Sequence, residues 1–91
     1  MAMYPYVTFP DETLVCHSQI LNFDGIESIK VHFERPTEHG FDGVTFSLPS
    51  YEWKRSEGKY TDAEIERFID FLKHNESLLF EFAATGGLDI A

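Results

Sequence analysis

Apolar and polar residues alternate along two central segments of the chain, and this alternation predicts β-strands. Every second residue from Ile29 to Phe33 is apolar, and the same holds from Val44 to Leu48. Successive side chains of a strand point to opposite faces of its sheet, so each segment would present one apolar and one polar face. Such two-sided strands are typical of an antiparallel sheet that is covered on one side only.

Shorter strand signals flank these two segments. Aromatic and β-branched residues favour extended structure over Tyr4–Phe9 and Thr13–Leu21. The sequence Asn22-Phe23-Asp24-Gly25 predicts a tight turn, because Asp-Gly adopts positive φ angles at low cost. After Pro49, we expect an extended edge over Tyr51–Lys54 and a polar loop over Arg55–Lys59.

The C-terminal third has a helical pattern. Thr61 and Glu64 fit a capping box, in which the two side chains bind otherwise unpaired N–H groups of the first turn. The apolar residues that follow lie at helical spacing, at Ile65, Phe68, Ile69 and Leu72. His74-Asn75 predicts a break, because Asn is a common left-handed cap. A second helix is expected over Glu76–Ala84, with Leu78, Leu79, Phe82 and Ala83 facing inward.

These elements predict a single α+β domain over residues 1–91. Its β-rich half, about residues 1–60, would form a meander-like antiparallel sheet of four or five strands. Its helical half, about residues 61–86, would place two helices on one face of the sheet. The length of 91 residues suits one domain and leaves no room for two.

The acidic charge of the chain limits the classes of partner that it is expected to bind. The chain carries 7 basic and 16 acidic residues, a formal charge of −9, and has no basic run. Binding to nucleic acid or to anionic membranes depends on clustered Lys and Arg, so neither partner is expected. The sequence shows no signal peptide and no apolar stretch of membrane-spanning length, which predicts a cytoplasmic protein.

One connection groups side chains that could perform chemistry. Glu38, His39 and Asp42 lie in the long segment between Arg35 and Gly43, and such groups can bind a divalent ion or share a proton. The same residues also suit an ordinary polar turn. Zinc sites need three or four ligands at characteristic spacings, which this segment lacks. We therefore predict no metal, no cofactor and no catalytic residue.

Two other groups of residues are candidate contacts. Tyr51 and Trp53, together with Tyr60, flank the polar loop and would either bind a partner or close the end of the sheet. Phe80 lies off the predicted inward stripe and is an expected interface residue. Cys16 and His17 are neighbours on a predicted strand, so their side chains face opposite sides and cannot form a catalytic pair.

Aromatic content then favours one class of function. Nine Phe residues are many for a core of this size, so part of the apolar surface is expected to be covered by another protein or by a second copy, in a homo-oligomer such as a dimer. The leading hypothesis is thus a non-enzymatic interaction or self-associating module. The alternative hypothesis is a small enzyme or a metal- or small-molecule-binding protein that uses Glu38, His39 and Asp42. A third is an acidic partner for a basic protein.

Overall fold

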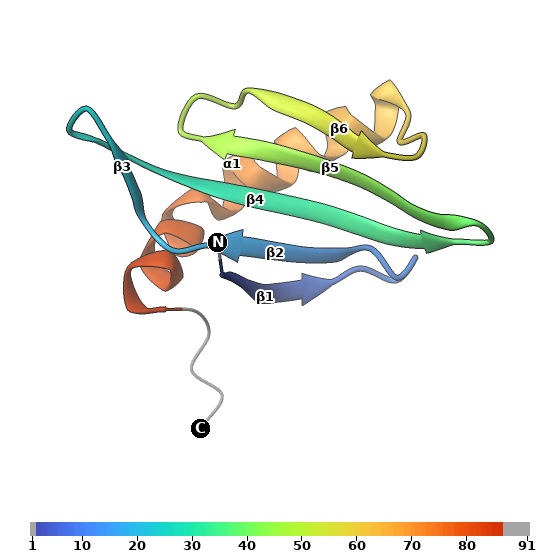
Figure 1. Ribbon diagram of the computed structural model, residues 1–91, viewed down its shortest axis with the longest axis horizontal. Coiled ribbons are helices and arrows are strands. Elements are labelled where there is room, and N and C mark those ends of the chain that lie inside the picture. Colours follow the sequence, from blue (N-terminus) through green and yellow to red (C-terminus); the bar gives the residue numbers. More distant parts are fainter. Residues whose placement is uncertain (1, 87–91) are drawn as a thin grey trace.

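The structure is a computed structural model that describes residues 2–86 (Figure 1). It contains six strands followed by one helix. The elements are β1 (Met3–Thr8), β2 (Leu14–Ser18), β3 (Leu21–Phe23), β4 (Ile26–Thr37), β5 (Gly40–Leu48), β6 (Trp53–Glu57) and α1 (Asp62–Thr85). The predicted α+β class with an antiparallel sheet is confirmed, while the predicted pair of helices is wrong.

The strands form one antiparallel sheet in the order β1-β2-β4-β5-β6, and β3 pairs with the start of β4 beyond the end of β2. The predicted turn before β4 is confirmed. Asp24 and Gly25 both have positive φ angles, 52° and 81°, as the two central residues of a hairpin turn with the right twist require. This hairpin carries β3 and the start of β4 past the rest of the sheet (Figure 1).

The strand predicted over Thr13–Leu21 is divided between β2 and β3. At the break, the Ser18 hydroxyl takes the place of a backbone group in the hydrogen bonding to β4. This hydroxyl donates to the Gln19 carbonyl at 2.8 Å and accepts the Lys30 N–H at 2.9 Å. The polar loop predicted over Arg55–Lys59 is also shorter than expected, since residues as far as Glu57 pair with β5.

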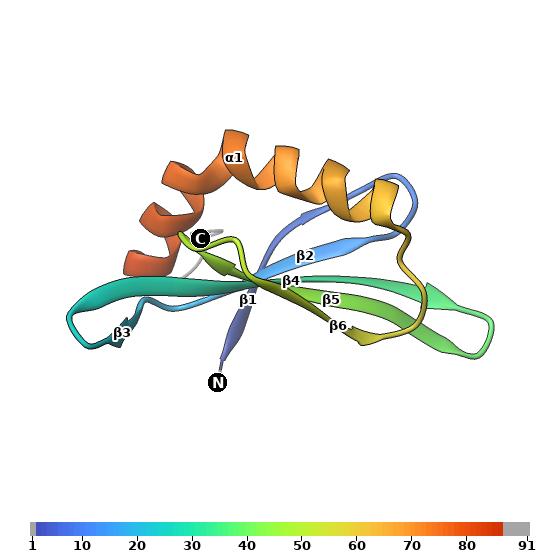
Figure 2. The same ribbon diagram turned by 90° about the horizontal axis from the view of Figure 1, so that it is seen from above.

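A single long helix, α1, arches over one face of the sheet and leaves the opposite face uncovered (Figure 2). The capping box at Thr61 and Glu64 is confirmed at its N-terminus. Gly86, with a φ angle of 85°, caps its C-terminus by donating its N–H to the Phe82 carbonyl. The helix bends along its length, and the longest molecular extent of 38 Å accommodates it.

The predicted break at His74-Asn75 does not occur, because the Asn75 side chain has one hydrogen-bond partner in the helix and one in β1. Its side-chain amide donates to the Phe71 carbonyl at 2.9 Å, and its oxygen accepts the Tyr6 hydroxyl from β1 at 2.7 Å. Asn75 is thus a polar member of the stripe that faces the sheet. The buried residues of this stripe are Ile65, Phe68, Leu72, Leu79 and Ala83.

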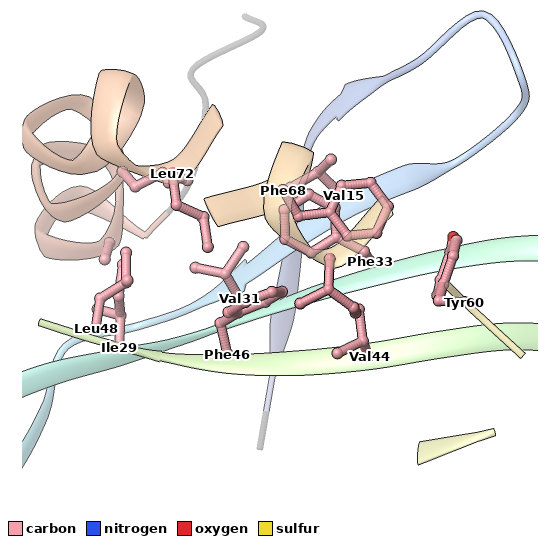
Figure 3. Close-up of a cluster of buried hydrophobic side chains, with 13 residues drawn as sticks. Val15, Ile29, Val31, Phe33, Val44, Phe46, Leu48, Tyr60, Phe68 and Leu72 are labelled. Carbon is pink, nitrogen blue, oxygen red and sulfur yellow. The ribbon is translucent and has the colours of Figure 1, made fainter. Parts of the chain in front are cut away.

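The core lies between α1 and the covered face of the sheet (Figure 3). The alternating residues of β4 and β5 point into it as predicted, and Ile29, Phe33, Val44 and Leu48 are fully buried. The ring of Phe33 stacks on that of Phe68 from α1, with centroids 4.2 Å apart. No helix within residues 2–86 combines the length and apolarity needed to cross a membrane.

Arg35 joins four parts of the fold at one end of this core. Its guanidinium donates to Asp42 of β5 and to Glu64 of α1, both at 2.7 Å, and to Asp11 of the β1–β2 turn at 3.2 Å. It also lies over the ring of Tyr60, 4.7 Å from the centroid. The hydrogen bond from Arg35 is the main cause that holds the pKa of Asp42 below its ordinary value of 3.8, and the Lys59 N–H adds to the effect.

Removing the charge of Asp42 tests this cluster. Asp42→Asn keeps an acceptor for the Lys59 N–H but leaves Arg35 without its buried partner. We expect the free energy of unfolding at pH 7 to fall by about 1–3 kcal/mol. Because the pKa of Asp42 is lowered on folding, its stabilising effect is complete above about pH 4 and is lost as the pH falls further. Denaturant unfolding between pH 7 and pH 2 should therefore show the two proteins converging in acid.

Asp62 provides the matched control for this experiment. Its side chain is 91% exposed and pairs with Arg55 at 2.7 Å, a geometry that contributes little in water. Asp62→Asn should change the free energy of unfolding by less than about 0.5 kcal/mol. Equal losses in the two variants would contradict a special role for the Arg35 cluster.

Candidate interaction surface

The uncovered face of the sheet is polar at its centre. Lys30 and Ser47 lie opposite each other on β4 and β5, and the Lys30 ammonium donates to the Ser47 hydroxyl at 2.6 Å. One row further along, the His32 ring bonds to the Thr45 hydroxyl at 2.8 Å. These cross-strand pairs fix the side chains without covering them, so this face is ordered and accessible.

Among the described residues, two adjoining depressions lie on this open face and share Lys30, Ser47 and Glu52. One, of about 310 Å³, extends toward β6, where Trp53 and Lys54 border it. The other, of about 440 Å³, extends toward the β3–β4 hairpin and the β5–β6 connection. Together they form a groove, here called the β6 groove, that crosses the open face.

The hairpin end of this groove is apolar. Phe23 and Ile26 are partners across the Asp24-Gly25 turn, and their side chains are 61% and 63% exposed. They are the most exposed large apolar residues in the described part of the chain. Two such neighbours on a projecting hairpin form an exposed apolar surface beside the polar groove.

The two edges of the sheet differ in how they are protected. Edge strand β1 contains Pro5, which has no N–H, and a register shift between Pro5 and Val7 interrupts its pairing. Edge strand β6 is exposed at all five positions, Trp53–Glu57, and contains no proline, although its pairing with β5 also has a register shift. Of the two edges, β6 is therefore the one that can accept an additional strand.

The ladder pattern identifies the free backbone groups of β6. The Glu52 carbonyl accepts the Ser47 N–H at 2.8 Å, so this carbonyl points toward β5, while the Glu52 N–H donates to the Ser50 hydroxyl. Backbone groups in an antiparallel strand alternate in direction, so Lys54 also points toward β5 while Trp53 and Arg55 point outward. The N–H and C=O groups of these two residues form the outer row of the edge.

Trp53 and Tyr51, both predicted contact residues, have different positions. The Trp53 side chain is 40% exposed at the edge, where it contacts Phe46 and the guanidinium of Arg55. Tyr51 is half-buried and has a φ angle of 64°, and its hydroxyl donates to Glu76 of α1 at 2.6 Å. Burial, followed by the Glu76 carboxylate, raises the pKa of Tyr51 to about 12. Tyr51 thus joins the β5–β6 connection to the helix.

The segment predicted as an alternative binding or catalytic site is a tight turn between the long strands β4 and β5. Glu38 and His39 lie at its tip with side chains 93% and 94% exposed, and the Glu38 Oε2 and His39 Nε2 atoms are 3.9 Å apart. Asp42 lies within β5 and binds Arg35 and the Lys59 N–H. His39 and Asp42 border one shallow depression, but the Asp42 carboxylate is held by these two donors. Within residues 2–86, no three His, Cys, Asp or Glu side chains are placed to hold a metal ion.

Phe80, the predicted interface residue, is half-buried and packs against the core. Leu78, which was expected to face inward, is instead 42% exposed. Phe80 therefore faces the core and Leu78 faces solvent. One continuous helix orients these side chains differently from a separate helix that starts at Glu76. Phe80 is therefore unsuitable as a surface probe, since a charge at that position would disturb the core.

The structure brings Cys16 and His32 together across β2 and β4, a pairing that the sequence did not indicate because it depends on strand register. His17, by contrast, is fully buried on the covered face, in agreement with the predicted opposition of neighbours. Burial, followed by the charge of Glu34, raises the pKa of the Cys16 thiol. A raised pKa lowers the thiolate fraction of Cys16 at neutral pH, and the thiolate is the nucleophilic form.

The sequence placed Lys54 on the expected edge but did not indicate that Lys30 and Ser47 lie beside it in the groove. Each belongs to a different strand, and only the β4–β5–β6 order brings them to one place. The alternation in β4 and β5 did place Lys30 and Ser47 on the polar face. Sheet order was the missing information.

Thiol reactivity tests the geometry of the open face. Glu34→Gln removes the charge that raises the pKa of Cys16, so the thiolate fraction should rise. We expect iodoacetamide to alkylate the variant about two to three times faster at pH 7.5. Glu38→Gln makes the same change at the exposed turn and should leave the rate unaltered. Equal rates in the wild type and in Glu34→Gln would contradict the placement of Glu34 beside Cys16.

Comparison with known proteins adds no assignment to this geometry. No protein-family model, no curated protein sequence and no solved structure matches the chain significantly. The roles given to the residues of β6 and the open face therefore rest on their positions, contacts and charges.

Proposed function

We propose that this protein is a non-enzymatic protein-interaction module that binds its partner by adding a strand to β6. The observation that carries the proposal is the asymmetry of the two sheet edges. The pairing of each edge strand contains a register shift, but β1 also contains Pro5, whereas β6 presents five exposed residues without proline. Main-chain hydrogen bonds to a free edge are a common basis of protein recognition.

The open face supplies further contact area for such a partner. The β6 groove begins beside Trp53 and ends at the apolar pair Phe23 and Ile26. A strand laid along β6 would direct alternate side chains toward this groove. Backbone pairing would then provide affinity, and the groove would provide specificity.

Site-specific photo-crosslinking in the native cells tests the proposal. A benzophenone amino acid in place of Trp53 should form an adduct of defined mass, with another protein or with a second copy. The same amino acid at Leu78, which is similarly exposed on α1, serves as the control and should form no such adduct. An adduct of equal yield at both positions, or none at Trp53, would contradict the proposal.

Proline substitution separates backbone pairing from side-chain contact. Arg55→Pro removes an outward N–H, whereas Arg55→Ala removes the side chain and keeps that N–H. With the crosslinker at position 53, the adduct should be lost in the proline variant and retained in the alanine variant. Retention in both variants would show that the outer backbone row of β6 is not used.

A further inference from the structure

Charge is distributed unevenly between the two layers of the molecule. Helix α1 carries six acidic and two basic side chains. Four of the seven basic residues of the chain lie elsewhere: Lys54 and Arg55 on β6, Lys59 just after it, and Lys30 on β4, where it borders the same depression as Lys54. An acidic protein therefore has a locally basic edge at the strand that is open for pairing.

Two of these lysines lack a carboxylate partner among the described residues. The Lys30 ammonium donates a hydrogen bond to the Ser47 hydroxyl, Lys54 is exposed, and within residues 2–86 neither forms an ion pair. Both border the depression beside β6. In a chain with more than twice as many acidic as basic residues, the depression beside β6 is lined by two ammonium groups without an ion pair and by one carboxylate, that of Glu52, and this net positive lining suits an anionic partner.

We propose, as an extension of the proposed function, that the strand added to β6 is an acidic segment of another protein. In an antiparallel pair, the side chains of directly opposite residues share a face and interact. Residues opposite Lys54 and Arg55 would then be Glu or Asp. The carboxylate opposite Lys54 would point to the open face, where the β6 groove and Lys30 lie. An apolar β-branched residue would oppose Trp53.

A second copy of the chain fits this edge in fewer registers than an acidic strand does. Pairing of two β6 strands about Arg55 or about Lys54 places like charges directly opposite each other, which is destabilising. Pairing about Ser56 passes through the register shift between β5 and β6, where the regular alternation of the edge is lost. Pairing about Trp53 would instead place Glu52 opposite Lys54, so a second copy fits one regular register of this edge, and the sedimentation experiment below decides between it and an acidic chain.

Three synthetic peptides test this proposal on the full-length protein. The probe is the blocked peptide acetyl-Thr-Thr-Glu-Glu-Val-Thr-Thr-amide, and the controls carry Gln-Gln or Lys-Lys in place of Glu-Glu. Trp53 is the only tryptophan of the chain, so its emission reports binding at the edge. Amide NMR shifts of Trp53 and Arg55 report backbone pairing. The Glu peptide should bind most tightly and should perturb both signals.

Two charge-reversal variants locate the interaction. Lys54→Glu should weaken binding of the Glu peptide about five- to tenfold, the effect of replacing an attractive cross-strand pair by a repulsive one. Lys73→Glu makes the same change in net charge on the exposed side of α1 and should alter affinity less than about twofold. Equal effects of the two variants would overturn the assignment of the site.

The remaining outcomes separate this inference from the function on which it rests. If the Gln or Lys peptide pairs with Trp53 and Arg55 as well as the Glu peptide does, the acidic occupant is wrong and strand addition at β6 stands. If sedimentation shows a dimer that Arg55→Pro abolishes, the occupant is a second copy and the inference is also overturned. If no peptide perturbs Trp53 or Arg55, the acidic occupant is rejected, and crosslinking at Trp53 decides the proposed function independently.

Discussion

The arrangement of the layers depends on the interactions of the Arg35 guanidinium. It binds carboxylates from the β1–β2 turn, from β5 and from the first turn of α1, and it lies over the ring of Tyr60 just before the helix. Asp42, its partner on β5, also accepts the Lys59 N–H and so fixes the segment between β6 and α1. Gly58 must remain without a side chain there, since a Cβ atom would overlap Asp42. One ionic cluster therefore sets where β6 ends and where α1 begins.

The position of α1 then determines which surfaces remain free. One helix covers one face of the sheet, and its buried stripe packs on β4 and β5 (Figures 2 and 3). The opposite face and the outer side of β6 are left uncovered. The polar side-chain pairs of the open face, such as Lys30 with Ser47, form hydrogen bonds with each other and leave the groove beside them open. The interaction surface is thus a consequence of having one helix layer in place of two.

The sequence predicted those features that depend on local pattern. The alternation in β4 and β5, the Asp24-Gly25 turn and the capping box at Thr61 each depend on a few neighbouring residues. The prediction of two helices was wrong because Asn75 resembles a cap, and only its long-range bond to Tyr6 shows it to be part of one continuous stripe. The groove was missed for a related reason, since Lys30 and Lys54 meet through strand order. Long-range pairing is the information that local patterns lack.

The central claim is that β6 is an open edge, and hydrogen exchange of the free protein tests it most directly. Residue-resolved NMR should show an alternating pattern in dilute solution. The Lys54 amide, which points toward β5, should exchange slowly, while the Trp53 and Arg55 amides should exchange at nearly unprotected rates. If Trp53 and Arg55 were as strongly protected as Lys54, the outer side of β6 would already be covered, and the edge could not be the binding surface.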